Sequence, residues 1–183
     1  MTFIQYLKSV EACEPAVEWA ENKTIEEVVA TCHRGDWLLW LAKKCDIGLQ
    51  PLTLAKGHCA NTVRHLMKDE RSIKAVDVAI AFGEGKATRE ELDAAAAYAA
   101  AAAYYADAYD AAAVDAAAAA YASAAHADHA ASAANSSAYA AAAYAAAAAY
   151  YADANRLQTA DICRKHIGEL IIEKVNQILT ETP

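Results

Sequence analysis

Glycine and proline are scarce in this sequence, with six and three copies among 183 residues. All-β proteins and disordered linkers both need turn-forming residues in quantity, so the composition excludes these two classes. Alanine, the residue with the highest helix propensity, fills 51 positions instead. We therefore expect an all-α protein.

Large hydrophobic side chains are nearly absent from residues 94–154, where 39 of 61 positions are alanine and Val114 is the single Val, Ile, Leu, Met, Phe or Trp. The other 37 such residues lie outside this segment, so an ordinary core must come from the two ends of the sequence. The length fits one domain. We predict a single domain over residues 1–183, in which a bundle of short helices (1–86) packs with an alanine-rich helical hairpin and a C-terminal helix (87–183).

Lysine and arginine are also missing from residues 94–154, whereas the whole chain has 24 acidic and 16 basic residues and a formal charge of −8. Nucleic-acid binding needs clustered basic side chains and is not expected. The aspartates of the alanine-rich segment predict an acidic face, which suits either a basic protein partner or simply solubility. Asp107, Asp110 and Asp115 are the candidate partner-binding residues.

The residues that drive membrane insertion are missing from the longest uncharged stretch. Residues 129–152 carry no Asp, Glu, Lys or Arg, but they also lack Leu, Ile, Phe and Val and include His129 and Asn135. A transmembrane helix is therefore not expected. The five cysteines form no C-x-x-C motif, and the N-terminus does not resemble a signal peptide. We expect a cytoplasmic protein whose reduced cysteines lie buried as small hydrophobic side chains.

Motifs for catalysis or cofactor binding are absent from the sequence. It has no G-x-S-x-G, P-loop, H-E-x-x-H or glycine-rich strand-to-helix turn. Cys32 and His33 are neighbours on a helix and point in different directions, which makes them poor partners as nucleophile and base. Pairs of possible metal ligands at helical spacing have no evident third ligand, so we expect no metal, no cofactor and no enzymatic activity. These pairs are His58 with His65, His126 with His129, and Cys163 with His166.

Helix signals punctuate the first half of the chain. Pro15 suits the first turn of a short helix, and Thr24 with Glu27 forms a capping box. Thr88 with Glu91 forms a second capping box after the clearest break in the pattern. These signals predict helices that begin at positions 14–15, 25 and 89.

A separate signal surrounds the two neighbouring tryptophans. Residues 37–41 are apolar on nearly every side of a helix, which predicts a buried helix with Trp37 and Trp40 in the core. Asp36 is the expected N-cap of this helix, after a stop at Gly35.

The 15 residues 94–108 recur unchanged at residues 140–154, as an internal duplication or replication slippage would produce. Between the copies, Asn135, Ser136 and Ser137 favour a break in the helix around residues 134–137. We therefore predict two long helices that are joined there as an antiparallel hairpin.

A helical wheel assigns the two faces of this hairpin. The tyrosines fall on one side and the aspartates on the other, so we expect packed tyrosines and exposed aspartates. The tyrosines are Tyr98, Tyr105, Tyr109, Tyr144 and Tyr151, and the aspartates are Asp93, Asp107, Asp110, Asp115 and Asp153. Beyond Asn155 an apolar stripe from Leu157 to Ile178 lies opposite the tyrosines of the second copy. We expect one continuous helix that touches different neighbours at its two ends and closes over the N-terminal bundle.

The most distinctive stretch is TIEEVVATCHRGDWLLWLA (24–42), which occurs together with GEGKATREEL (83–92), the alanine/tyrosine tract and QTADICRKHI (158–167). This combination resembles the Imm-5 immunity protein family of bacterial polymorphic toxin systems over residues 12–170. The resemblance is carried by Gly35, Asp36, Trp37, Trp40, Asp161, Arg164 and Ile167.

The resemblance implies an α-helical bacterial or phage protein that neutralises a toxin or effector by binding it, without catalytic residues. We expect Arg34, Asp36 and Arg164 to form an internal ion-pair network, so that these matching residues are structural. Two other functions stay open: a mobile-element or phage inhibitor of a host defence system, and a structural protein whose alanine-rich helices associate with copies of itself.

Overall fold

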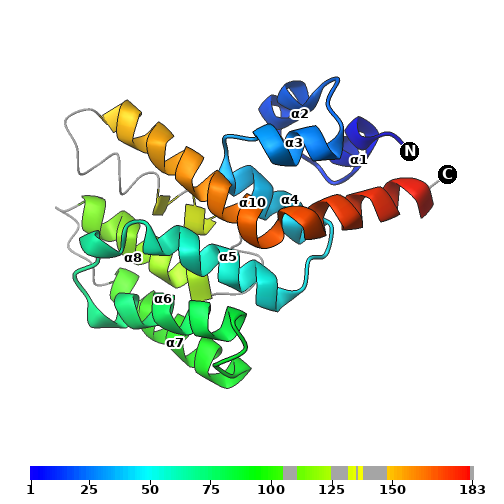
Figure 1. Ribbon diagram of the computed structural model, residues 1–183. Coiled ribbons are helices and arrows are strands. Elements are labelled where there is room, and N and C mark those ends of the chain that lie inside the picture. The colour runs from blue at the N-terminus through cyan, green and yellow to red at the C-terminus, as the bar shows by residue number, and fades with distance from the viewer. Residues whose placement is uncertain (105–110, 125–131, 135, 138–147, 182–183) are drawn as a thin grey trace.

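The computed structural model describes residues 1–104, 111–124, 132–134, 136–137 and 148–181, and every element in these ranges is helical (Figure 1). The expected all-α fold is confirmed. The helices are α1 (Phe3–Ser9), α2 (Glu14–Ala20), α3 (Ile25–Thr31), α4 (Gly35–Lys44), α5 (Leu49–Asn61), the 3-10 turn η1 (Arg64–Leu66), α6 (Glu70–Gly83), α7 (Arg89–Tyr104), α8 (Ala111–Ala124) and α10 (Ala148–Glu181).

The predicted capping boxes form at the starts of α3 and α7. The Thr24 hydroxyl accepts from the backbone N–H of Glu27, and the Glu27 carboxylate accepts from the backbone N–H of Thr24 at 2.8 Å. Thr88 and Glu91 exchange the same two bonds, at 2.7 and 3.2 Å. Pro15 lies in the first turn of α2, as predicted.

The predicted N-cap of α4 is wrong. The helix begins at Gly35, and Arg34 occupies the cap position without a side-chain cap. The Asp36 carboxylate instead accepts two hydrogen bonds from the Arg34 guanidinium, at 2.8 and 2.6 Å. Two hydrogen bonds between oppositely charged groups are stronger than one bond from the carboxylate to a backbone N–H, so the carboxylate turns toward the arginine.

The 34-residue helix α10 runs between two groups of helices, α1–α4 on one side and α5–α8 on the other (Figure 1). It passes through Asn155 without a break, and Ile167, Ile171 and Val175 are completely buried against the N-terminal helices. The predicted continuous helix that closes over the N-terminal bundle is confirmed. Leu157 departs from the predicted apolar stripe, since it is 51% exposed.

The alanine-rich segment does not form the predicted two-armed hairpin. The stretch before residue 134 contains two helices, α7 and α8, which pack against each other and against α6. Helix covers residues 94–104 of the first repeat copy and 148–154 of the second, as predicted, and the rest of both copies lies outside the described residues.

The predicted tyrosine face is also wrong. Tyr98 is 64% exposed and Tyr151 is 49% exposed, whereas most buried positions described on α7, α8 and the start of α10 are alanines. A methyl side chain lets two helix backbones approach closely, and a tyrosine at the same position would hold them apart. The buried alanines are Ala95, Ala99, Ala102, Ala119, Ala120, Ala122, Ala124 and Ala152.

The remaining residues of the wheel have mixed outcomes. Asp93 and Asp153 are exposed, as predicted. Asp115 lies on α8 and is partly buried, and this burial raises the pKa of its carboxyl. Tyr105, Tyr109, Tyr144, Asp107 and Asp110 lie outside the described residues.

Neighbouring substitutions on α7 test which face is packed. We expect Tyr98→Ala to change the free energy of unfolding by less than about 0.5 kcal/mol, because its ring lies in water. Ala99→Leu should cost about 1–3 kcal/mol, because Ala99 is completely buried and the added atoms have no space. Urea denaturation of both variants measures the difference. A larger loss of unfolding free energy for Tyr98→Ala than for Ala99→Leu would support the packed tyrosine face that the helical wheel predicted.

Candidate functional site

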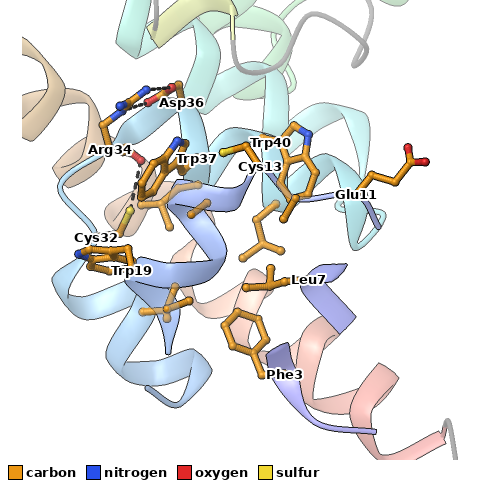
Figure 2. A pocket seen from close by; sticks show the side chains of 16 residues that line it. Phe3, Leu7, Glu11, Cys13, Trp19, Cys32, Arg34, Asp36, Trp37 and Trp40 are labelled. Carbon is orange, nitrogen blue, oxygen red and sulfur yellow. Dashed lines mark hydrogen bonds and ion pairs between the residues drawn. The ribbon is translucent and has the colours of Figure 1, made fainter. Parts of the chain in front are cut away.

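A groove of about 360 Å³ opens between α1, α2 and α4, beside the end of α3 (Figure 2). Its volume falls in the range of pockets that bind ligands or anchor side chains. Phe3 and Leu7 of α1 form one wall, and Trp19, Trp37 and Trp40 line the rest together with alanine, leucine and valine side chains. The chain has three tryptophans, and all of them line this groove.

Both tryptophans of α4 differ from their predicted place in the core. Leu38, Leu39 and Ala42 occupy the core side of the helix, while Trp37 and Trp40 are half-buried and face the groove. The nearly all-apolar sequence of this helix therefore has two causes. One face fills the core, and a second face forms the wall of an accessible groove.

Aromatic rings and cations are stacked along one side of the groove. The rings of Trp19, His33 and Trp37 lie 5.9–6.1 Å apart, centroid to centroid. Lys23 lies 4.5 Å from the centre of the Trp19 ring, and Arg34 lies 4.9 Å from that of Trp37. Lys44 lies 5.4 Å from the Trp40 ring. These contacts hold the indoles in place before any partner arrives, which lowers the ordering cost of binding.

The rim of the groove carries polar groups in defined positions. Arg34 and Asp36 form the bidentate pair described above, and the Asp36 hydrogen bonds raise the pKa of Arg34. Glu11 lies at the mouth, where its backbone has a φ of 62°. This left-handed turn ends α1, where the backbone N–H of Ala12 donates to the Leu7 carbonyl oxygen at 2.9 Å.

Glutamates outnumber lysines in the first 31 residues of the chain, which include α1, α2 and α3. Residues 1–31 contain six glutamates and two lysines, and all six glutamates are exposed. This segment alone supplies half of the formal charge of the chain. The glutamates lie on α2, on α3 and in the turns after α1 and α2, whereas the cations Lys23, Arg34 and Lys44 lie against the tryptophan rings.

Arg164 and Asp161 fasten α10 beneath the groove. Arg164 donates to the backbone carbonyl oxygen of Cys32 at 2.7 Å and pairs with the Asp161 carboxylate. Arg34–Asp36 and Arg164–Asp161 are thus two separate ion pairs. The expected structural role fits Arg164, whereas Arg34, Asp36, Trp37 and Trp40 line the groove.

Residues of the candidate metal-ligand pairs make other contacts in the structure. His58 stacks on His166, with 4.6 Å between the ring centres, and Cys163 contacts Cys59 at 3.9 Å between the sulfurs. No group of three or more possible metal ligands occurs in the described part of the chain. His126 and His129 lie outside it.

The cysteines offer no activated thiol next to a base. Burial raises the pKa of Cys32 to about 11, its thiol donates to the Arg34 carbonyl, and His33 is exposed. A thiol that stays protonated is a poor nucleophile. All five cysteines are free, and Cys13 is exposed at the groove, contrary to the prediction that all are buried.

Lys56 is a completely buried lysine that the sequence reading missed. Burial lowers the pKa of its amine to about 8, with a further contribution from Arg89. Lys56 follows Leu52 by one helical turn and precedes Ala60 by one turn, and all three are buried. This i, i+4, i+8 stripe was the signal that could have revealed it.

Comparison of the chain with protein-family models, with curated proteins and with solved structures finds no match. Within the described ranges, no helix is both long enough and apolar enough to cross a membrane. The described residues form an all-α protein with an apolar groove, in which contacts with neighbouring rings and cations hold the tryptophans.

Proposed function

We propose that this protein is an immunity-type inhibitor, which neutralises a basic toxin or effector by direct protein–protein binding. One observation carries the proposal: all three tryptophans line one accessible groove, where cations hold their rings. Tryptophan and arginine are enriched among the residues that dominate binding energy at protein interfaces. The resemblance to the Imm-5 family supports the same function.

The charge around the groove supports a basic partner. Glu11 at the mouth of the groove and the exposed glutamates of α2 and α3 would meet the rim of a partner whose apolar side chain enters the groove. Complementary charge of this kind speeds association and makes it sensitive to salt. This proposal puts the binding groove on the N-terminal helices, and a contribution of Asp107, Asp110 and Asp115 to partner binding stays a separate prediction.

The test begins with capture of the partner from the native host, followed by binding and inhibition assays with the purified partner. Because every tryptophan lines the groove, the intrinsic fluorescence of this chain should change when the partner binds. We expect Trp40→Ser to weaken binding at least about 30-fold, as for an interface hot spot. It should also abolish neutralisation.

Tyr98→Ser is the matched control, since Tyr98 is an exposed aromatic residue on α7, which does not line the groove. It should bind and neutralise like the wild type. Equal affinity of the Trp40 variant and the wild type would contradict the groove as the binding site. Self-association without any partner would favour the structural alternative.

A further inference from the structure

The interface between α5 and α10 has three side-chain contacts in succession. Asn155 donates to the Thr62 hydroxyl at 2.9 Å, the sulfurs of Cys59 and Cys163 lie 3.9 Å apart, and the rings of His58 and His166 lie 4.6 Å apart. As α10 advances from 155 to 166, its partner on α5 moves back from 62 to 58. The two helices therefore run in opposite directions, and the histidine pair is the last of these contacts.

The two imidazoles are stacked in a way that favours packing over metal binding. Their planes differ by 11°, and both side chains are half-buried. The nitrogen lone pairs of an imidazole lie in the plane of the ring. In parallel stacked rings these lone pairs do not converge on one ion, so the contact is one between ring faces.

The surroundings of the pair disfavour positive charge. Burial lowers the pKa of both His58 and His166, and Lys165 beside them lowers both further. The charge of His58 also lowers the pKa of His166.

Glu84 at the end of α6 acts in the opposite direction on His58, but it is already paired with Lys86 at 2.7 Å. Glu84, the acidic group near the histidines, is therefore already neutralised by Lys86. If His58 and His166 were both protonated, their positive charges would repel each other across the interface.

We propose that the His58–His166 stack is an acid-sensitive contact, which holds α5 to α10 while both rings are neutral and loosens the two helices when both become protonated. This inference does not depend on the proposed function. It predicts that the contact between α5 and α10 weakens as the pH falls.

The sign of the effect follows from proton linkage. Both folded pKa values lie below the ordinary value of 6.5, so the unfolded chain binds more protons in mildly acidic solution. The stability due to the neutral pair is complete above pH 6.5 and is lost as the pH falls below it. The paired carboxylates of Asp69 and Asp77 titrate lower still, because arginine hydrogen bonds lower their pKa values. These two carboxylates therefore stay charged in mild acid, and the double histidine variant below separates the histidines from Asp115, whose pKa is raised by burial.

Amide hydrogen exchange and histidine NMR titration of the full chain test this proposal. Between about pH 7.5 and about pH 5.5 we expect exchange protection in α5 and in residues 155–166 to fall about tenfold more than in α6. The double variant His58→Gln/His166→Gln should lose this extra response. His65→Gln, an exposed histidine on η1, is the matched control and should keep it.

Single variants keep the test decisive if the double variant does not fold. In His58→Gln, the titration midpoint of His166 should rise toward its ordinary value, because a neighbouring charge has been removed. The proposal is overturned if the wild-type rings titrate at or above pH 6.5, or if wild type and double variant lose protection equally in acid.

Discussion

Gly35→Ala is expected to destabilise the protein by about 3 kcal/mol, at the upper end of the range for overpacking a tight contact. A Cβ on Gly35 would lie 2.5 Å from the Oγ1 and 2.7 Å from the carbonyl carbon of Thr159 on α10. The hydroxyl could rotate away, but the carbonyl carbon belongs to the helix backbone. α4 and α10 would have to separate, and this contact lies next to the buried leucines of α4.

Urea denaturation monitored by circular dichroism measures this loss. Alanine has a higher helix propensity than glycine, so any destabilisation at the first residue of α4 comes from the steric contact. Gly48→Ala is the matched control, because a Cβ there would meet its nearest neighbour at 3.9 Å. Its cost should stay below about 1 kcal/mol, as for a change at a helix N-cap. Equal losses for the two variants would show that α4 and α10 are not in backbone contact at Gly35.

Lys56→Met should stabilise the protein at neutral pH by about 2–3 kcal/mol. The amine is charged in the unfolded chain, and its pKa of about 8 in the folded protein, compared with 10.5, corresponds to a cost of about 3 kcal/mol for holding that charge in the interior. Methionine has a similar length and carries no charge that burial would strip of water. Lysine at this position therefore lowers stability below what the fold could reach.

The pH dependence separates this effect from simple repacking. Above pH 8 the folded protein releases the Lys56 proton while the unfolded chain keeps it, so the wild type gains stability as the pH rises. The advantage of the methionine variant should narrow by about 1 kcal/mol between about pH 7 and about pH 9. The tyrosine and cysteine titrations are common to both proteins and cancel in the difference.

Lys74→Met, at an exposed position on α6, is the control and should show no such narrowing. A Lys56 variant that is less stable than the wild type by the same amount at every pH would contradict the prediction. The amine would then contribute a favourable interaction that outweighs its burial.

Local signals in the sequence were reliable guides to where helices begin. The pairs Thr24–Glu27 and Thr88–Glu91 form as predicted, because each capping box needs residues only three positions apart. Asp36 failed as a cap because a nearby arginine competed for its carboxylate. N-cap preferences describe the helix alone and do not include a neighbouring side chain such as Arg34.

The tyrosine face failed for a different reason. A wheel separates two kinds of residue on a helix but does not say which kind is packed. Tyr98 was assigned to the interior for its large apolar area, yet Ala99 lies there, because the neighbouring helices approach too closely for a ring. In a segment with little besides alanine, close approach of backbones takes the place of hydrophobic area.

The groove and the histidine pair could not be predicted from the sequence. The groove requires knowing that α1, α2 and α4 meet on one side of α10, and this arrangement leaves no periodic trace in any one of them. His58 and His166 are 108 positions apart, and neither has a neighbour in sequence that indicates the other. Contacts of this kind depend on the tertiary fold.

The place of α10 at the end of the described chain determines when the N-terminal helices can become buried during synthesis. Ile167, Ile171 and Val175 complete the core to which α1, α3 and α4 contribute, so these helices leave the ribosome long before their main packing partner. Contacts between residues so distant in sequence slow folding and prolong the exposure of apolar surface. On a nascent chain, Leu38 and Leu39 are available to chaperones until α10 is translated.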